Sequence, residues 1–206
     1  MNKKMRKWTA GALLAVALCG VTVGLGRADD EEDAKKLKQA IAAATEEVLK
    51  NLNKVGTADF PAMAGKIAKE HKIEATMKLF KPKSKNGVGI GGLTGASHKD
   101  SIELLIRDYT IKAPNKAEVT KYADDLVKLA QITSVVAEMT PSWVPLKDGP
   151  AGKTKAKWMQ LSEEMRKGSA ELVAAAKAKD DKAVEAAAKK LNGSCAECHK
   201  IFRDDK

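Results

Sequence analysis

The sequence predicts an all-α protein built from long amphipathic helices. Of the 206 residues, 44% are hydrophobic but only 4% are aromatic, and Ala and Lys, which favour helix over strand, are abundant. Apolar residues recur three and four positions apart over several long stretches, which is the spacing of one helix face. Polar turns separate these stretches. The length allows one domain with a sizeable core, and a helix bundle is the expected architecture.

The first 28 residues are typical of a secretory signal peptide. Basic residues near the start precede an uncharged, mostly apolar run from Ala10 to Leu25, and the small residues Gly26 and Ala28 precede the expected cleavage site. Residues 1–28 carry five basic residues and no acidic one, so cleavage lowers the net charge from +10 to +5. We expect residues 29–206 to form a single domain without a membrane span; an uncleaved anchor is the alternative.

The sequence of the first half of this domain predicts two helical regions and a glycine-rich loop. A long helix is expected from Asp29 to Val55, because acidic residues at its start suit the helix dipole. A shorter, less regular helical region is expected over 57–83. Residues 84–95 fit neither the P-loop nor the dinucleotide-binding pattern, so we expect a flexible connection rather than a ligand-binding loop. The apolar face of the first helix consists of Leu37, Ile41, Ala44, Val48 and Leu52.

The second half predicts one short helix and three long ones. The short helix is expected from Asp100 to Thr110. Asn115 resembles the first residue of a capping box and begins a long helix that Pro141 ends. A further long helix is expected over 154–177, and the last begins at Asp180. The apolar stripe of the last helix contains Val184, Ala187, Ala188, Leu191, Cys195 and Cys198.

Three residues of the last helix form the strongest chemical signal in the chain. Cys195, Cys198 and His199 make a Cys-x-x-Cys-His motif, which is typical of a c-type haem attachment site. Positions three and four apart share a helix face, so both thiols can reach the same porphyrin. The imidazole that follows is a usual ligand of haem iron. The motif predicts one covalently bound haem c, with His199 as the proximal axial ligand.

Other uses of a Cys-x-x-Cys pair have less support. A structural zinc site needs four ligands, and the only other histidines are His71 and His98. Cys19 leaves with the signal peptide, so the domain has no second cysteine pair. A thioredoxin-like redox pair lies near a βαβ pattern, which this helical sequence lacks. An ordinary structural disulfide between Cys195 and Cys198 remains as an alternative.

The last third of the chain carries a wider pattern around this motif. Haem attachment close to the C-terminus, on the last helix and followed by an aromatic residue and an arginine, resembles class II cytochromes c, the cytochrome c′ type. The resemblance covers about residues 158–203. It is carried by Trp158, the run 170–176, Asp181, Ala183, and residues 194–203.

The resemblance implies a four-helix bundle of the cytochrome c′ type. Extra short helices and the glycine-rich loop would lie in an insertion over 57–114, which is longer than expected between the first two bundle helices. Residues 154–206 would supply the helices that carry the haem. By the same resemblance Arg203 would lie near a haem propionate, a pairing that suits arginine; a favourable charge at the helix end is the alternative.

The far face of the haem is where this sequence departs from the family. In the family the first helix supplies either a ligating Met or an apolar residue that leaves iron five-coordinate. The stretch from Asp29 to Val55 contains neither Met nor His. Met77 is the candidate sixth ligand, followed by Met63 and His98; ordinary core packing is the alternative for the methionines.

These observations predict an exported, periplasmic or secreted monohaem c-type cytochrome that carries single electrons. Its positive charge favours acidic redox partner proteins, and relatives of this type often form homodimers. The alternative is a five-coordinate haem protein that binds small gases such as NO or CO, and a haem-free helical module with a disulfide is a third reading. The sequence shows no nucleophile–base constellation of an enzyme and no aromatic-interleaved basic patch for nucleic acid.

Overall fold

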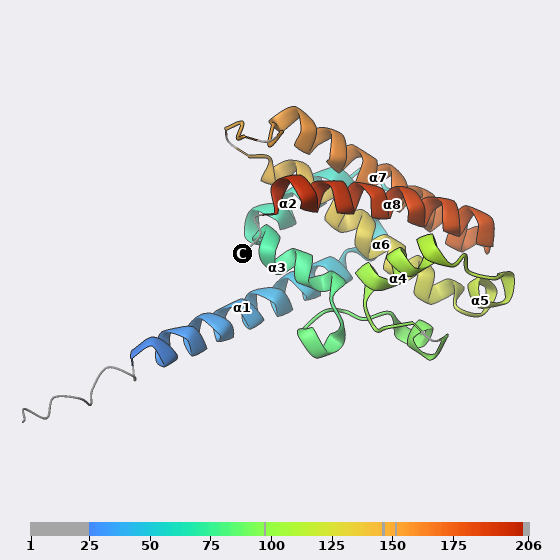
Figure 1. Ribbon diagram of the computed structural model, residues 1–206, viewed down its shortest axis with the longest axis horizontal. Coiled ribbons are helices and arrows are strands. Elements are labelled where there is room, and N and C mark those ends of the chain that lie inside the picture. The colour runs from blue at the N-terminus through green and yellow to red at the C-terminus, as the bar shows by residue number, and fades with distance from the viewer. Residues whose placement is uncertain (1–24, 97, 146, 151, 204–206) are drawn as a thin grey trace, which may run out of the picture. The chain divides into compact units, whose positions relative to one another are not determined.

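The computed structural model describes residues 25–96, 98–145, 147–150 and 152–203 (Figure 1). These residues are mainly helical and contain no strand, so the predicted all-α fold class is confirmed. Contacts divide the chain into residues 1–35 and residues 36–206, and the second unit contains the bundle and the Cys-x-x-Cys-His motif.

Three consecutive helices form the centre of the second unit. Helix α6 (Ala123–Met139) packs against α7 (Lys155–Ala178), and α7 packs against α8 (Asp181–Phe202), with α7 and α8 side by side in Figure 1. Side chains cap both later helices: Thr154 Oγ1 accepts from the Lys157 N–H at 3.1 Å, and Asp180 Oδ1 accepts from the Ala183 N–H at 3.0 Å. Such caps satisfy N–H groups that have no partner within the helix.

Helix α4 (Ile102–Ile111) is the second neighbour of α8. Ser101 caps it, because its Oγ accepts from the Leu104 N–H at 3.4 Å. In the family that the sequence resembles, the first helix supplies the residue over the far haem face. The structure instead places α4, from within the 57–114 stretch, against the helix that carries this motif. The buried face of α4 consists of Ile102, Leu105, Ile106 and Tyr109, which recur at helical spacing.

Helix α1 (Leu25–Lys50) contributes to the core from its second half. Ile41, Ala44 and Val48 are buried, as the periodicity predicts, but Leu37 is 42% exposed. The predicted apolar face is therefore wrong at its first residue. The elements that follow are η1 (Leu52–Lys54), α2 (Phe60–Glu70), which packs against α6, α3 (Ile73–Met77) and η2 (Lys78–Phe80).

The glycine-rich loop is anchored to the rest of the fold rather than being a free connection. It contains the short elements η3 (Lys83–Lys85) and η4 (Gly91–Ala96). Asp100 Oδ1 accepts from the Ile90 N–H at 2.8 Å, and a second carboxylate, Asp125 Oδ2 of α6, accepts from the Gly92 N–H at 2.9 Å. Leu93 within the loop is fully buried. The expectation of a flexible connection is wrong for this physical reason.

The helix predicted from Asn115 is broken near its start. It consists of α5 (Lys116–Lys121) and α6, which meet at Tyr122, where the backbone leaves helical geometry. The predicted cap is present, since Asn115 Oδ1 accepts from the Glu118 N–H at 2.9 Å. The Glu118 carboxylate does not close the capping box but accepts from the Tyr109 hydroxyl at 2.8 Å. Helix α6 then ends in η5 (Thr140–Trp143), at the proline predicted to stop it.

No helix among the described residues is both long and apolar enough to cross a bilayer. Residues 1–24, which make up most of the expected signal peptide and include Cys19, lie outside the described part of the chain.

Candidate haem site

Helix α8 carries the motif on the face that the sequence predicts. Leu191 is fully buried, and Cys195, one turn later, packs against the same core. Cys198 and His199 lie one further turn along and are half-buried. The two thiols and the imidazole therefore share one side of the helix, close to its C-terminal end, as attachment of a single porphyrin requires.

Aromatic packing fixes the end of α8 against α7. The rings of Trp158 and Phe202 meet edge to face, with centroids 5.0 Å apart, an arrangement that aromatic pairs favour. The Trp158 Nε1–H donates to the Thr140 carbonyl at 2.8 Å, so the buried indole leaves no polar atom unpaired. Both aromatic residues thus position the last turn of α8, where the motif lies.

The environment of His199 favours the form of imidazole that binds a metal. Burial lowers the pKa of His199, and the positive charges of Arg203 and Lys81 lower it further, whereas Glu103 acts in the opposite direction. A lowered pKa keeps the ring neutral, and neutral imidazole is the ligating species. Three charged groups therefore lie within electrostatic reach of the His199 ring. They are Arg203 just beyond α8, Lys81, and Glu103 in the first turn of α4.

Both cysteines are free thiols in the structure rather than a disulfide. Burial raises the pKa of Cys195 to about 12, with smaller contributions from Cys198 and Glu103 in the same direction and from a hydrogen bond with Ser194 in the other. Burial also raises the pKa of Cys198. The two sulfur atoms are therefore kept as neutral thiols, available for thioether formation with a haem held against this face.

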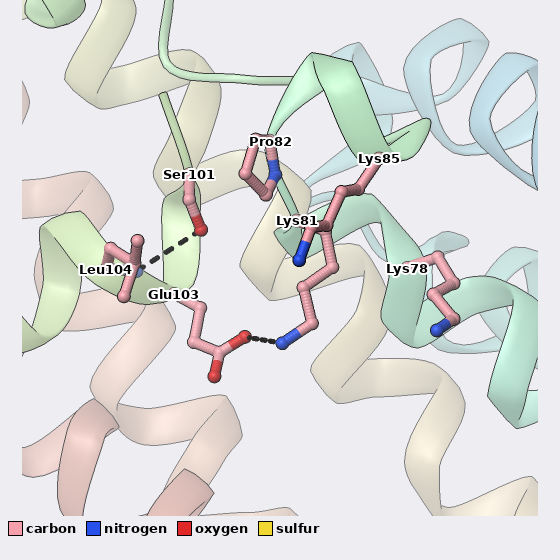
Figure 2. Close-up of a pocket in the computed structure, with 7 residues that line it drawn as sticks. All are labelled: Lys78, Lys81, Pro82, Lys85, Ser101, Glu103 and Leu104. Atoms are coloured by element: carbon pink, nitrogen blue, oxygen red, sulfur yellow. Dashed lines mark hydrogen bonds and ion pairs between the residues drawn. The ribbon is translucent and has the colours of Figure 1, made fainter. Parts of the chain in front are cut away.

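A cavity of about 270 Å³ lies between the segment after α3 and the first turn of α4 (Figure 2). The ammonium of Lys81 pairs with the Glu103 carboxylate across it, and Ser101 Oγ donates to the Phe80 carbonyl at 2.8 Å at its inner side. Helix α4, whose first turn lines the cavity, packs against α8, which carries the motif. Lys81 and Glu103 also lie within electrostatic reach of His199. Its lining consists of Lys78, Lys81, Pro82, Lys85, Ser101, Glu103 and Leu104.

The remaining predicted residues occupy three different settings. Arg203 is exposed immediately after α8, and its N–H donates to the His199 carbonyl at 3.2 Å. Met77 ends α3, packs half-buried against the core, and directly precedes the cavity residue Lys78. His98 lies elsewhere, with Nε2 3.1 Å from Glu118 and Nδ1 3.7 Å from Asp108. Both ring nitrogens of His98 thus face carboxylates, which makes it a poor candidate for a sixth ligand.

Lys81 and Glu103 are the site residues that the sequence did not reveal. Lysines and glutamates are frequent throughout this chain. The packing of α4 against both η2 and α8 brings these two within electrostatic reach of His199. The capping serine before α4 is a local signal that marks where this helix begins.

Comparison with protein-family models matches residues 151–203 to the family described as Cytochrome C'. Over these residues the chain is similar to cytochrome c′-like, class II cytochromes. The match covers α7, α8 and the whole motif. No curated protein and no solved structure was found to match the chain. The match supports a c-type cytochrome haem protein in the C-terminal part of the chain, whereas α1 to α6 lie outside the matched residues.

The residues present fit a haem of the c type. Two unpaired thiols stand one turn apart on one helix face, next to an imidazole held neutral by its surroundings. Among the described residues, no group of three or more His, Cys, Asp and Glu side chains could hold a metal ion. The donor set therefore lacks the four ligands of a structural zinc site but has the two thiols and one axial ligand that haem c uses.

Proposed function

We propose that the protein is an exported one-electron carrier with a single haem bound through Cys195 and Cys198 and ligated by His199. The observation that carries this proposal is the place of the motif, at the partly exposed end of α8. Cys198 and His199 are half-buried, and Arg203 just beyond them is exposed. A haem held there by Cys195, Cys198 and His199 would lie at the partly exposed end of α8, within reach of a redox partner.

The chain's own residues then have distinct roles. A bound haem supplies the ferric/ferrous couple. The two cysteines hold it in place, and His199 presents a neutral ring nitrogen to the iron. The packed pair of Trp158 and Phe202 holds this end of α8 against α7. Met77 is our candidate for the sixth ligand, since it directly precedes the cavity beside the motif.

The partners proposed for this carrier are acidic redox proteins. Lys81 and Arg203 lie near the motif, and the chain after residue 28 has a net charge of +5. Opposite charge on a partner speeds the encounter and orients the two surfaces. The role requires no catalytic group, so we propose that the protein is not an enzyme. Export follows from the signal-like composition of residues 1–28.

A five-coordinate, gas-binding haem protein is the second candidate. The observation that favours it is the composition of α4, the helix that packs against α8 together with α7. Leu104 lines the cavity beside the motif, and α4 contains neither Met nor His. If α4 faces the iron, the sixth position has no protein ligand and stays open for NO or CO.

Absorption spectra of the haem-loaded chain test both candidates. The protein is purified from a host that attaches c-type haem, and spectra are recorded oxidised, reduced, and reduced with carbon monoxide. For the electron carrier we expect low-spin bands, a sulfur-to-iron charge-transfer feature in the ferric form, and no change with the gas. High-spin ferrous bands that shift promptly on adding the gas would replace this proposal with the second candidate.

A further inference from the structure

The cavity beside the motif carries an excess of positive charge that the fold itself does not neutralise. Lys78, Lys81 and Lys85 line it, against the single carboxylate of Glu103. Only Lys81 is paired with that carboxylate (Figure 2). Within the described part of the chain, neither Lys78 nor Lys85 forms an ion pair. The cavity is thus suited to an anion, and its volume of about 270 Å³ is several times the ~30 Å³ share of one water molecule.

The neighbouring motif indicates which anion would bind in this cavity. A haem tethered to Cys195 and Cys198 brings two propionate carboxylates with it. A carboxylate placed in a half-buried setting needs a cation to offset its lost hydration. The cations within electrostatic reach of His199 are Arg203 and Lys81. Of these two, Lys81 lines the cavity with a side chain that is 37% exposed, whereas Arg203 is exposed beyond the helix end.

We propose that a haem propionate occupies this cavity and pairs with the Lys81 ammonium, which exchanges its contact with Glu103 for one with the propionate. Lys81 is then a residue that positions the haem. The inference rests on the proposed attachment of haem to the motif. The exchange requires only local movement, because the side chains of Lys81 and Glu103 are 37% and 41% exposed. An ion pair this exposed contributes little to stability, so Glu103 can turn towards solvent at small cost.

The test compares Lys81→Gln with the matched control Lys112→Gln in the haem-loaded chain. Lys112 is exposed directly after α4, at the opposite end of the helix from Glu103. Resonance Raman spectra report the propionate bending band, which moves when a propionate loses a hydrogen-bond donor. We expect Lys81→Gln to shift this band and to lower the midpoint potential, because removal of a nearby positive charge favours ferric haem. Lys112→Gln should change neither, and Lys81→Arg should restore both.

An unchanged propionate band in Lys81→Gln would overturn the inference, whether or not the potential moves. If Lys81→Gln does not accumulate, Glu103→Gln decides. If Lys81 pairs with the propionate, loss of the Glu103 charge leaves the propionate bending band unchanged. A shifted band in Glu103→Gln would show that Lys81 had still been paired with Glu103. A pyridine haemochrome spectrum of the unmodified chain distinguishes failure of this inference from failure of the proposed function. Absence of covalent haem in that spectrum would contradict the proposed function itself.

Discussion

The close contact between α7 and α8 at Gly168 gives a sharp quantitative prediction. A Cβ atom added at Gly168 would lie 3.1 Å from the Leu191 nitrogen, 3.2 Å from its Cα and 3.3 Å from its Cβ. Two of these three atoms belong to helix backbone and cannot turn away as a flexible side chain can. Leu191 lies one turn before Cys195, so this contact also sets where the motif sits relative to α7.

The expected magnitude follows from two opposing effects of Gly168→Ala. Alanine within a helix is favoured over glycine by about 1 kcal/mol, whereas overpacking a core contact costs about 1–3 kcal/mol. We therefore expect a net loss of about 0–2 kcal/mol. Gly193→Ala in α8 is the matched control, because no atom lies within 4 Å of its added Cβ. That variant should gain about 1 kcal/mol.

Thermal and urea unfolding of the haem-loaded variants, followed by far-ultraviolet circular dichroism, measure this difference. For a domain of this size, 1 kcal/mol corresponds to about 2–4 °C in Tm. Gly168→Ala should thus unfold below the wild-type chain or near it, and Gly193→Ala above it. Equal stabilisation by both substitutions would refute the reasoning, since it would mean that the two helices do not approach closely at this point.

Three further predictions concern other parts of the site and its support. Trp158→Phe leaves the carbonyl of Thr140 without its donor and should cost about 1–3 kcal/mol in unfolding free energy, measured by urea titration; a loss below about 0.5 kcal/mol would contradict this role. Burial would raise the pKa of Asp100, but the N–H groups of Ile90 and Lys83 and the Thr94 hydroxyl lower it below its usual value. Its stabilising effect is therefore present above the unfolded pKa of about 3.9 and is lost as the pH falls through the folded value. Asp100→Asn should cost about 0.5–1.5 kcal/mol at neutral pH, because solvent screens this carboxylate and the amide oxygen still accepts. The variant should lose less stability on acidification than wild type; parallel pH profiles would argue against it. Met77→Ala should abolish the sulfur-to-iron absorption of the ferric protein, and persistence of that band would exclude Met77 as ligand.

The helices and the motif could be predicted from the sequence because their signals are local. The apolar spacing of α4, α7 and α8, the Asn115 cap and the proline after α6 each depend on residues within a few turns. The haem motif is equally local, since its three residues share one helix face wherever the helix lies. For this reason the buried stripe of α8 agrees with the prediction up to the motif itself.

Which helices pack against each other could not be predicted from such local signals. The stretches at α1 and α4 both have an apolar face, and the spacing alone does not say which of them packs on α8. The anchored loop depends on Asp100 and Asp125, whose hydrogen bonds reach backbone groups 10 and 33 residues away. Lys81 and Glu103, 22 residues apart, meet for the same reason. Such contacts arise from tertiary packing rather than from any local pattern.

Covalent attachment of haem to α8 is the central claim, and one measurement tests it directly. The chain is expressed in a host that attaches c-type haem, unfolded, extracted with acidified acetone, and analysed by intact mass and pyridine haemochrome spectrum. Two thioethers at Cys195 and Cys198 predict a mass increase of one haem per chain that survives extraction, with the haemochrome band of a doubly attached haem. A chain at its polypeptide mass, with the haem lost to the acetone or never bound, would contradict the claim.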